Sequence, residues 1–311
     1  MRKPRKLRSG DTIALIAPAG PVTDRACLNE AVAEIEKRGF KVVQGKYAAQ
    51  PPYGYLSGTD DQRRADLEEM LQRADVNAVF CLKGGYGSIR LLKDGPAAIL
   101  PTGDKIFVGF SDITTLLLAG YAANHGTVFH GPMPVFDFTS LDGFSANANA
   151  LFHLIGGDAE ALQINLAEAQ YSSSSNCEVS GTLWGGNLSG IANLAGTSHI
   201  AAVSDSIIFF EEVDEQPYAI DRYLTRIELT GLFDPAKAFI VGELVDCEPM
   251  PGKPSFTARE VIEERLSRYG VPVVFTNAFG HGARMCTFPI GCRATLNCAN
   301  GLLLLDESPV A

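Results

Sequence analysis

The sequence predicts an α/β protein with two domains: a doubly wound parallel sheet, then a smaller β-rich domain. Short apolar runs alternate with helical patterns in the first half, and this periodicity fades between residues 156 and 180, where polar turn residues gather. A chain of 311 residues that is 46% hydrophobic is long enough for two cores. We therefore expect an α/β domain over residues 1–160, a linker over 161–180 and a β-rich domain over 181–311.

The first half alternates strands and helices. Apolar runs typical of buried parallel strands stand at residues 13–17, 41–43, 78–82, 106–110 and 127–130. Helical patterns follow them, at residues 24–38, 60–71, 88–92, 112–124 and 145–155. The second of these helices follows a Thr59-x-x-Gln62 capping box. Such alternation implies right-handed crossovers and a parallel sheet, whose ligands bind at the carboxyl ends of its strands.

The second half mixes short strands with helices. Strand patterns stand at residues 206–210, 238–245, 273–275, 293–296 and 302–305. Helices are expected from Pro217 to the residue before Gly231, and over residues 257–269.

The chain is acidic, with a net charge of -10 and an isoelectric point near 5.0. This argues against nucleic acid as a partner, because neutralising phosphates needs clustered Lys and Arg. The one basic cluster, within residues 2–8, precedes an apolar run too short for a signal peptide. No stretch approaches the roughly 20 apolar residues that span a bilayer. We expect a soluble, cytoplasmic protein that binds no membrane.

The seven cysteines favour a reducing compartment, since several lie in apolar runs where a reduced thiol packs as a small hydrophobic group. Cys286, Cys292 and Cys298 recur every six residues near His281, but no Cys-x-x-Cys pair occurs. We therefore predict no metal site and no cofactor.

A serine stands at a sharp strand-to-helix corner, in Gly109-Phe110-Ser111-Asp112. A hydroxyl at such a corner stands out from the sheet at a helix N-terminus, where free N–H groups stabilise a developing oxyanion. The second glycine that usually ends a serine-hydrolase corner is Ile113 here. An alternative interpretation makes Ser111 or Asp112 a plain helix N-cap.

A glycine-rich loop, residues 83–87 (KGGYG), follows the third strand. A glycine N–H can approach a substrate with no side chain in the way, so we assign the oxyanion hole to the N–H groups of Gly85 and Asp112. A phosphate-binding loop would need Gly-x-Gly-x-x-Gly or Gly-Lys-Ser/Thr, and neither spacing is present. A plain tight turn is the other alternative.

An acid and a histidine in the second half complete a catalytic set. Glu211 is the first polar residue after an apolar strand, where a carboxylate needs a partner, although acidic clusters are most often solvated. His281 lies between two glycines, on adaptable backbone that can aim its imidazole. In a triad, His281 would take the proton of Ser111, and Glu211 would orient the imidazole.

Six motifs resemble, in order, those of the LD-carboxypeptidase family, serine peptidases that also include the microcin-immunity proteins. They are residues 83–87 (KGGYG), 109–112 (GFSD), 130–133 (HGPM), 184–188 (WGGNL), 211–222 (EEVDEQPYAIDR) and 280–281 (GH). The resemblance implies a flavodoxin-like N-terminal domain, a β-rich, barrel-like C-terminal domain, and a triad assembled across their interface, usually in a homodimer. Family members commonly carry Glu-Asp where this chain has Glu211-Glu212, so Glu212 stays open as the triad acid.

The resemblance also implies an activity: removal of the terminal D-alanine from murein tetrapeptides during cytoplasmic cell-wall recycling. Such an enzyme must hold a terminal carboxylate, for which Arg90 is a candidate from its spacing, a surface arginine being the alternative. The other candidates for substrate contacts are Gly84, Tyr86, Trp184 and Asn187. Trp184, the only tryptophan, could instead belong to the core.

Three other functions stay open. The first is a peptidase of the same family that hydrolyses a peptidyl-nucleotide antibiotic, and the second is a two-lobed binding protein that performs no chemistry. A metal hydrolase is least favoured, because the His and acid residues lack H-x-x-x-H spacing.

Overall fold

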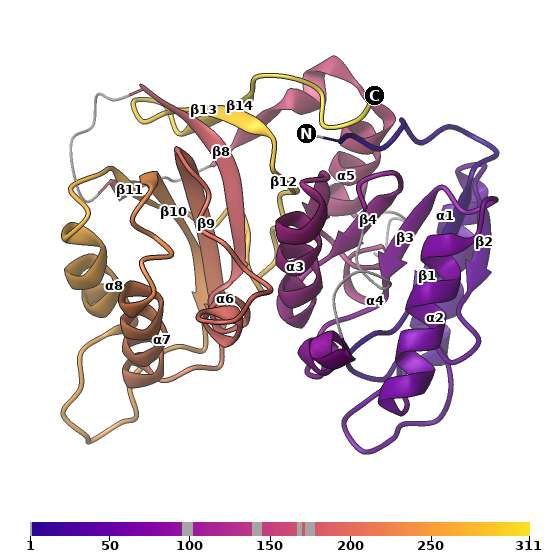
Figure 1. The fold of residues 1–311 in the computed structure, drawn as a ribbon, viewed down its shortest axis with the longest axis horizontal. Helices are drawn as coiled ribbons and strands as arrows, with labels where there is room; N and C mark the ends of the chain where they lie inside the picture. Colours follow the sequence, from indigo (N-terminus) through magenta and orange to yellow (C-terminus); the bar gives the residue numbers. More distant parts are fainter. Residues whose placement is uncertain (1, 95–101, 139–144, 167–169, 172–177) are drawn as a thin grey trace. The chain divides into compact units, whose positions relative to one another are not determined.

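The computed structural model describes residues 2–94, 102–138, 145–166, 170–171 and 178–311. The chain, drawn in Figure 1, divides into two compact units. Unit 1 comprises Met1–Ala161, Thr287–Gly291 and Ser308–Ala311, and unit 2 comprises Leu162–Cys286 and Cys292–Glu307. The second domain was expected to hold every residue after 180, whereas residues 287–291 and 308–311 cluster with unit 1.

Unit 1 is built on a six-stranded sheet with the order β12-β5-β4-β3-β1-β2. The strands are β1 (Thr12–Ile16), β2 (Lys41–Gln44), β3 (Ala78–Cys81), β4 (Ile106–Gly109), β5 (Val128–His130) and β12 (Phe288–Ile290). All neighbours pair in parallel except β12, which runs antiparallel to β5. The predicted doubly wound parallel sheet is therefore confirmed. Strand β12 was missed because a three-residue run that includes a proline carries no alternation to detect.

Helices lie between the parallel strands of unit 1, and two more, α4 and α5, follow the last of these strands, β5. They are α1 (Arg25–Lys37), α2 (Asp60–Gln72), α3 (Thr114–Asn124), α4 (Pro134–Asp137) and α5 (Ala146–Gly156), with the 3-10 turns η1 (Ser88–Asp94), η2 (Ser111–Ile113) and η3 (Ala159–Leu162). The predicted capping box at Thr59 and Gln62 is present at the start of α2. Strands β1, β3 and β4 are buried at every position, as expected for strands covered on both faces.

Unit 2 holds an eight-stranded mixed sheet with the order β6-β14-β13-β8-β9-β10-β11-β7. The strands are β6 (Gln163–Asn165), β7 (Gln170–Tyr171), β8 (Glu178–Asn187), β9 (Ser206–Val213), β10 (Ala236–Val245), β11 (Val273–Phe275), β13 (Arg293–Asn297) and β14 (Leu302–Leu305). The four strands β8, β9, β10 and β11 pair in parallel, and the flanking strands pair antiparallel. In the part of unit 2 that the structure describes, the sheet is open, not barrel-like.

Among the described residues, unit 2 contains the helices α6 (Leu188–Leu194), α7 (Pro217–Leu229) and α8 (Ala258–Ser267). Arg265 of α8 ties α8 to α7, because its Nε and Nη1 donate to Asp221 Oδ1 at 2.8 Å and to Glu228 Oε2 at 3.3 Å. Each helix start follows a parallel strand, so the carboxyl ends of β8 and β9 lead directly into α6 and α7. Asn187, Glu211 and Glu212 stand at this edge of the sheet.

Candidate functional site

Ser111 sits at the expected corner between β4 and α3, in a strained backbone conformation. Its φ is +61°, in the left-handed region that costs a non-glycine residue about 1–3 kcal/mol. The residues that cap η2 and α3 are Phe110 and Ile113, and neither makes a side-chain cap hydrogen bond. The N-cap interpretation is therefore wrong. Gly109 is required, because a Cβ there would lie 2.3 Å from Ile113 Cγ2.

The glycine-rich loop lies directly against this serine. A Cβ on Gly84 would be 2.7 Å from Ser111 Cβ and 2.9 Å from Ser111 Oγ, so only glycine fits. Gly85 has a φ of +108°, a conformation open to glycine. The N–H of Gly20 donates to Gly84 O at 2.9 Å, a hydrogen bond that holds the loop against the segment after β1.

Ser88 fastens the end of the loop to the serine corner. Its N–H donates to Asp112 Oδ2 at 2.8 Å, and its hydroxyl donates to Asp112 O at 2.6 Å. Burial raises the pKa of the Asp112 carboxyl, and the Ser88 N–H partly offsets this. The side chain of Asp112 thus holds the loop and the corner together, a role that the sequence did not indicate.

Arg63 is a buried arginine that contacts the same loops, and the sequence did not single it out. Arg63 is 2% exposed, and its guanidinium donates to the carbonyl oxygens of Pro18, Gly58 and Gly87. It also pairs with Asp60 at 2.5 Å. Pro18 and Gly87 lie 45 and 24 residues away along the chain, so the helical pattern over residues 60–71 does not reveal these contacts.

The candidate carboxylate-binding residue, Arg90, is engaged within unit 1. Its Nη2 lies 2.9 Å from Asp60 Oδ2, and its side chain is 40% exposed. Tyr86 is exposed, and its ring lies 5.9 Å from that of Tyr55. The substrate roles of Arg90, Tyr86 and Gly84 stay predictions.

In unit 2 the structure brings Glu211 and His281 together. His281 Nδ1 lies 2.7 Å from Glu211 Oε2, and the Glu211 side chain is 0% exposed while that of His281 is 21% exposed. Glu211 stands near the carboxyl end of β9, and His281 lies in the loop after β11. A buried carboxylate that accepts from Nδ1 fixes the imidazole and leaves Nε2 for proton transfer.

Glu212 points elsewhere, because successive side chains of a strand face opposite sides of the sheet. It accepts from Asn187 Nδ2 at 2.8 Å, from Ser189 N at 2.7 Å and from Val213 N at 2.9 Å. Burial, and then the charge of Glu211, raise the pKa of Glu212 to about 7. Of the two acids that sequence left open, Glu211 is the one that contacts His281.

Two predicted substrate residues have structural partners inside unit 2. Trp184 is 2% exposed, and its ring packs edge-on against Phe233 at 6.3 Å, as the core alternative expects. Its contact with a substrate stays a prediction. Asn187 is 4% exposed and caps α6 by accepting from Gly190 N. Its amide also donates to Glu212, which limits what it can offer a substrate.

Ser111 belongs to unit 1, whereas the Glu211–His281 pair belongs to unit 2. The pairing of Ser111 with His281, and hence the triad, stays a prediction. The same holds for the oxyanion hole at Gly85 and Asp112.

Other expectations concern metals, thiols and membranes. Within the described part of the chain, no three His, Cys, Asp or Glu side chains gather as metal ligands would. Among those same residues, Cys298 is disulfide-bonded, which the expectation of reduced cysteines did not include, and free thiols stand at Cys27, Cys81, Cys247, Cys286 and Cys292. No helix among the residues that the structure describes is long and apolar enough to cross a membrane.

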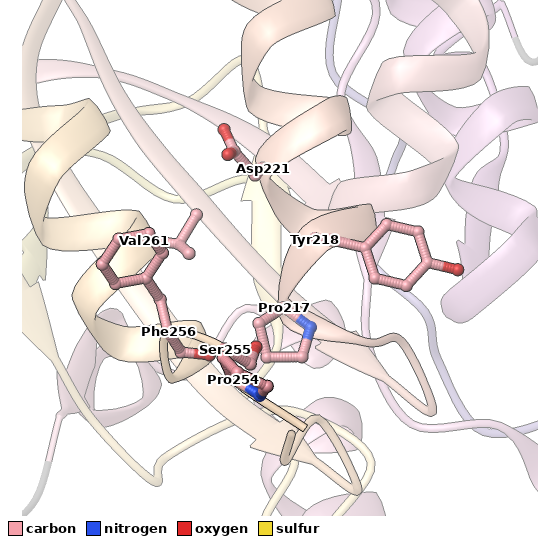
Figure 2. A pocket seen from close by; sticks show the side chains of 7 residues that line it. All are labelled: Pro217, Tyr218, Asp221, Pro254, Ser255, Phe256 and Val261. Carbon is pink, nitrogen blue, oxygen red and sulfur yellow. Dashed lines mark hydrogen bonds between the residues drawn. The ribbon is translucent and has the colours of Figure 1, made fainter. Parts of the chain in front are cut away.

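A hollow of about 490 Å³ lies in unit 2 at the start of α7 (Figure 2). Asp221 borders it and is held by Arg265, while Tyr218 and Phe256 are largely exposed. None of the predicted site residues lines it, the lining being Pro217, Tyr218, Asp221, Pro254, Ser255, Phe256 and Val261.

Comparisons with known proteins identify the family of this chain. Residues 13–131 match the family model described as the LD-carboxypeptidase N-terminal domain, and residues 180–296 match that of the LD-carboxypeptidase C-terminal domain. A probable murein peptide carboxypeptidase of Bacillus subtilis is 32% identical over 305 residues, which is 98% of this chain and 94% of the relative.

Two further relatives differ in what their names say. The microcin C7 self-immunity protein of Escherichia coli is 26% identical over 335 residues, covering 97% of this chain and 94% of that protein. The crystal structure of a muramoyltetrapeptide carboxypeptidase from Oxalobacter formigenes matches with a TM-score of 0.79 at 29% identity, over 95% of this chain and 99% of that one.

Proposed function

The chain belongs to the LD-carboxypeptidase family, and on this premise we propose that it is a serine carboxypeptidase that removes the terminal D-alanine from murein tetrapeptides. The observation that carries the proposal is the buried Glu211–His281 pair, at 2.7 Å. The enzyme acts in the cytoplasm as a homodimer and needs no metal or cofactor.

In the proposed reaction, Ser111 attacks the carbonyl carbon of the bond to D-alanine. His281 Nε2 takes the hydroxyl proton, and the carbonyl oxygen becomes an oxyanion held by the N–H groups of Gly85 and Asp112. Glu211 stabilises the resulting imidazolium. His281 then gives its proton to the leaving amine, so D-alanine departs and an acyl-enzyme remains.

Water completes the cycle. His281 removes a proton from the water that attacks the ester at Ser111, and returns it to the serine oxygen as the ester breaks. The products are D-alanine and a tripeptide. The strain at Ser111 supports this role, since strained residues at strand-to-helix corners expose a nucleophile at the edge of a sheet.

The test is the release of D-alanine from a murein tetrapeptide, followed with a D-amino-acid oxidase assay. Ser111→Ala should lower kcat by about 10⁴- to 10⁶-fold, the scale for loss of a triad nucleophile. Ser267→Ala, a change at an exposed serine of α8, is the matched control and should leave kcat unchanged. Equal activity of the wild type and Ser111→Ala would refute the mechanism.

A second candidate keeps the mechanism and changes the substrate to a peptidyl-nucleotide antibiotic. The similarity to the microcin C7 self-immunity protein of Escherichia coli favours it. Cleavage of such a conjugate while the murein tetrapeptide stays intact would select this function. If neither compound is cleaved but one binds, the chain is a binding protein.

A further inference from the structure

A third acid, Glu243, lies beside the Glu211–His281 pair because of a β-bulge in β10. Val241 pairs with Phe210, and the next pair is Leu244 with Glu212. Two residues of β10, Gly242 and Glu243, therefore stand opposite the single residue Glu211 of β9. Bulges of this kind re-aim a side chain next to a functional site.

The bulge places Glu243 under the loop that carries His281. Its backbone N–H donates to Phe279 O at 2.9 Å. A Cβ on Gly280 would lie 2.8 Å from Glu243 Cβ, and a Cβ on Gly282 would lie 1.9 Å from Glu243 Oε2. Glu243 thus crowds both glycines that flank His281: at Gly280 through its Cβ and backbone, and at Gly282 through its carboxylate. This crowding is a different reason for glycine from the adaptable backbone that the sequence suggested.

The surroundings of Glu243 disfavour the charged form of its carboxyl group. Burial raises its pKa, and the nearby charge of Glu211 adds to that, while a hydrogen bond from the N–H of Gly282 lowers it. One of its oxygens, Oε2, is inaccessible and has no hydrogen-bond partner among the described residues. A carboxylate in such a place does not stabilise the fold well, which points to a role in placing its neighbours.

We propose that Glu243 is a positioning residue that supports the Gly280-His281-Gly282 loop from beneath and holds the His281 imidazole against Glu211. Its carboxylate accepts from Gly282 on one side of the histidine, and its backbone is bonded to Phe279 on the other. The effect on catalysis rests on the proposed peptidase function, whereas the effect on the His281–Glu211 hydrogen bond does not.

The experiment compares Glu243→Ala, Glu243→Asp and Glu243→Gln in the full chain. Asp keeps the charge but is one methylene too short to reach Gly282, and Gln keeps both the length and an oxygen that accepts from Gly282. We expect Ala and Asp to lower kcat about 100-fold with KM unchanged, the scale for a misplaced catalytic group, and Gln to stay within about three-fold of the wild type. Glu248→Ala, at an exposed acid after β10, is the control.

A second readout needs no turnover. The proton between His281 Nδ1 and Glu211 is shielded from solvent on the carboxylate side, so we expect a downfield proton NMR resonance that His281→Ala removes. This resonance should persist in Glu243→Gln and be lost in Glu243→Asp and Glu243→Ala. If Glu243→Ala does not fold, the comparison of Asp with Gln decides.

Three results would overturn the inference. The first is a Glu243→Asp variant with the resonance and the kcat of the wild type. The others are a Glu243→Gln variant whose kcat falls as far as that of Glu243→Ala, and variants in which only KM changes. If the wild type cleaves no murein peptide, the proposed function fails, but the NMR comparison still decides the role of Glu243.

Discussion

The identity of the triad acid is tested by exchanging each of two adjacent glutamates for glutamine. Glu211→Gln keeps the shape of a side chain that is 0% exposed but removes the charge that faces His281 Nδ1 at 2.7 Å. The glutamine can still bond the ring, but it no longer stabilises the imidazolium that forms when Ser111 is deprotonated. A hydrogen bond to a charged group contributes about 1.5–3 kcal/mol, and loss of the orienting acid in a serine triad lowers kcat by about 10⁴-fold.

The control for this prediction is Glu212→Gln, one residue away and equally buried, at 1% exposure. Its partners are Asn187 and the N–H groups of Ser189 and Val213, and it makes no contact with His281. We expect Glu211→Gln to lower kcat by about 10³- to 10⁴-fold at constant KM, and Glu212→Gln by less than about 10-fold. Steady-state release of D-alanine measures both. A larger loss in Glu212→Gln, or a Glu211→Gln enzyme within 10-fold of wild type, would refute the assignment.

Three other predictions concern unit 1 and the pH dependence of folding. Gly84→Ala should lower kcat about 100-fold, because the added Cβ would lie 2.7 Å from Ser111 Cβ. The control is Gly156→Ala, since nothing lies within 4 Å of a Cβ at that position. Equal kcat in the two variants would contradict the close approach of Gly84 to Ser111. Arg63→Ala should lower the free energy of unfolding by about 3–5 kcal/mol, since it removes the buried guanidinium that donates to three carbonyl oxygens, while Asp60 keeps its pairing with Arg90. Arg73→Ala should change the free energy of unfolding by under about 1 kcal/mol in the same urea titrations. A similar loss in both variants would argue against the bracing role of Arg63. Burial raises the pKa of Glu212 in the folded state to about 7, above its ordinary value of 4.5. Between pH 4.5 and pH 7 the folded state therefore binds more protons than the unfolded state. The free energy of unfolding should fall by up to about 3 kcal/mol as the pH rises across this range. Urea titrations at pH 5 and pH 7.5 should show this fall in the wild type but a smaller one in Glu212→Gln, and an equal fall in both would contradict the raised pKa.

Features set by local sequence could be predicted. The change from strand to helix periodicity around Ser111 located the corner, and the Thr59–Gln62 pair located the start of α2. Glu211 was identified because it is the first polar residue after a buried strand, and His281 because glycines flank it. Each of these signals lies within a few residues along the chain.

Features that depend on partners distant in the chain could not be predicted from the sequence. The tight packing around Trp184 depends on the neighbouring strand β9: Gly185 admits the backbone of β9, since a Cβ there would lie 1.7 Å from Phe209 O. Glu243 looked like one polar residue in a strand, because the bulge that aims it depends on pairing with β9. Strand β12 joins unit 1 from the far end of the chain, which no local pattern reports.

The central claim, that Ser111 and His281 act on one substrate, is tested most directly by a crystal structure of the Ser111→Ala variant with an intact murein tetrapeptide. We expect the carbonyl carbon of the bond to D-alanine to lie within about 3.5 Å of the position of the serine oxygen, with His281 Nε2 about 2.6–3.2 Å from that same position. A bound tetrapeptide with His281 Nε2 more than about 6 Å from the serine position would contradict the account, because no proton transfer crosses such a distance without a bridging water.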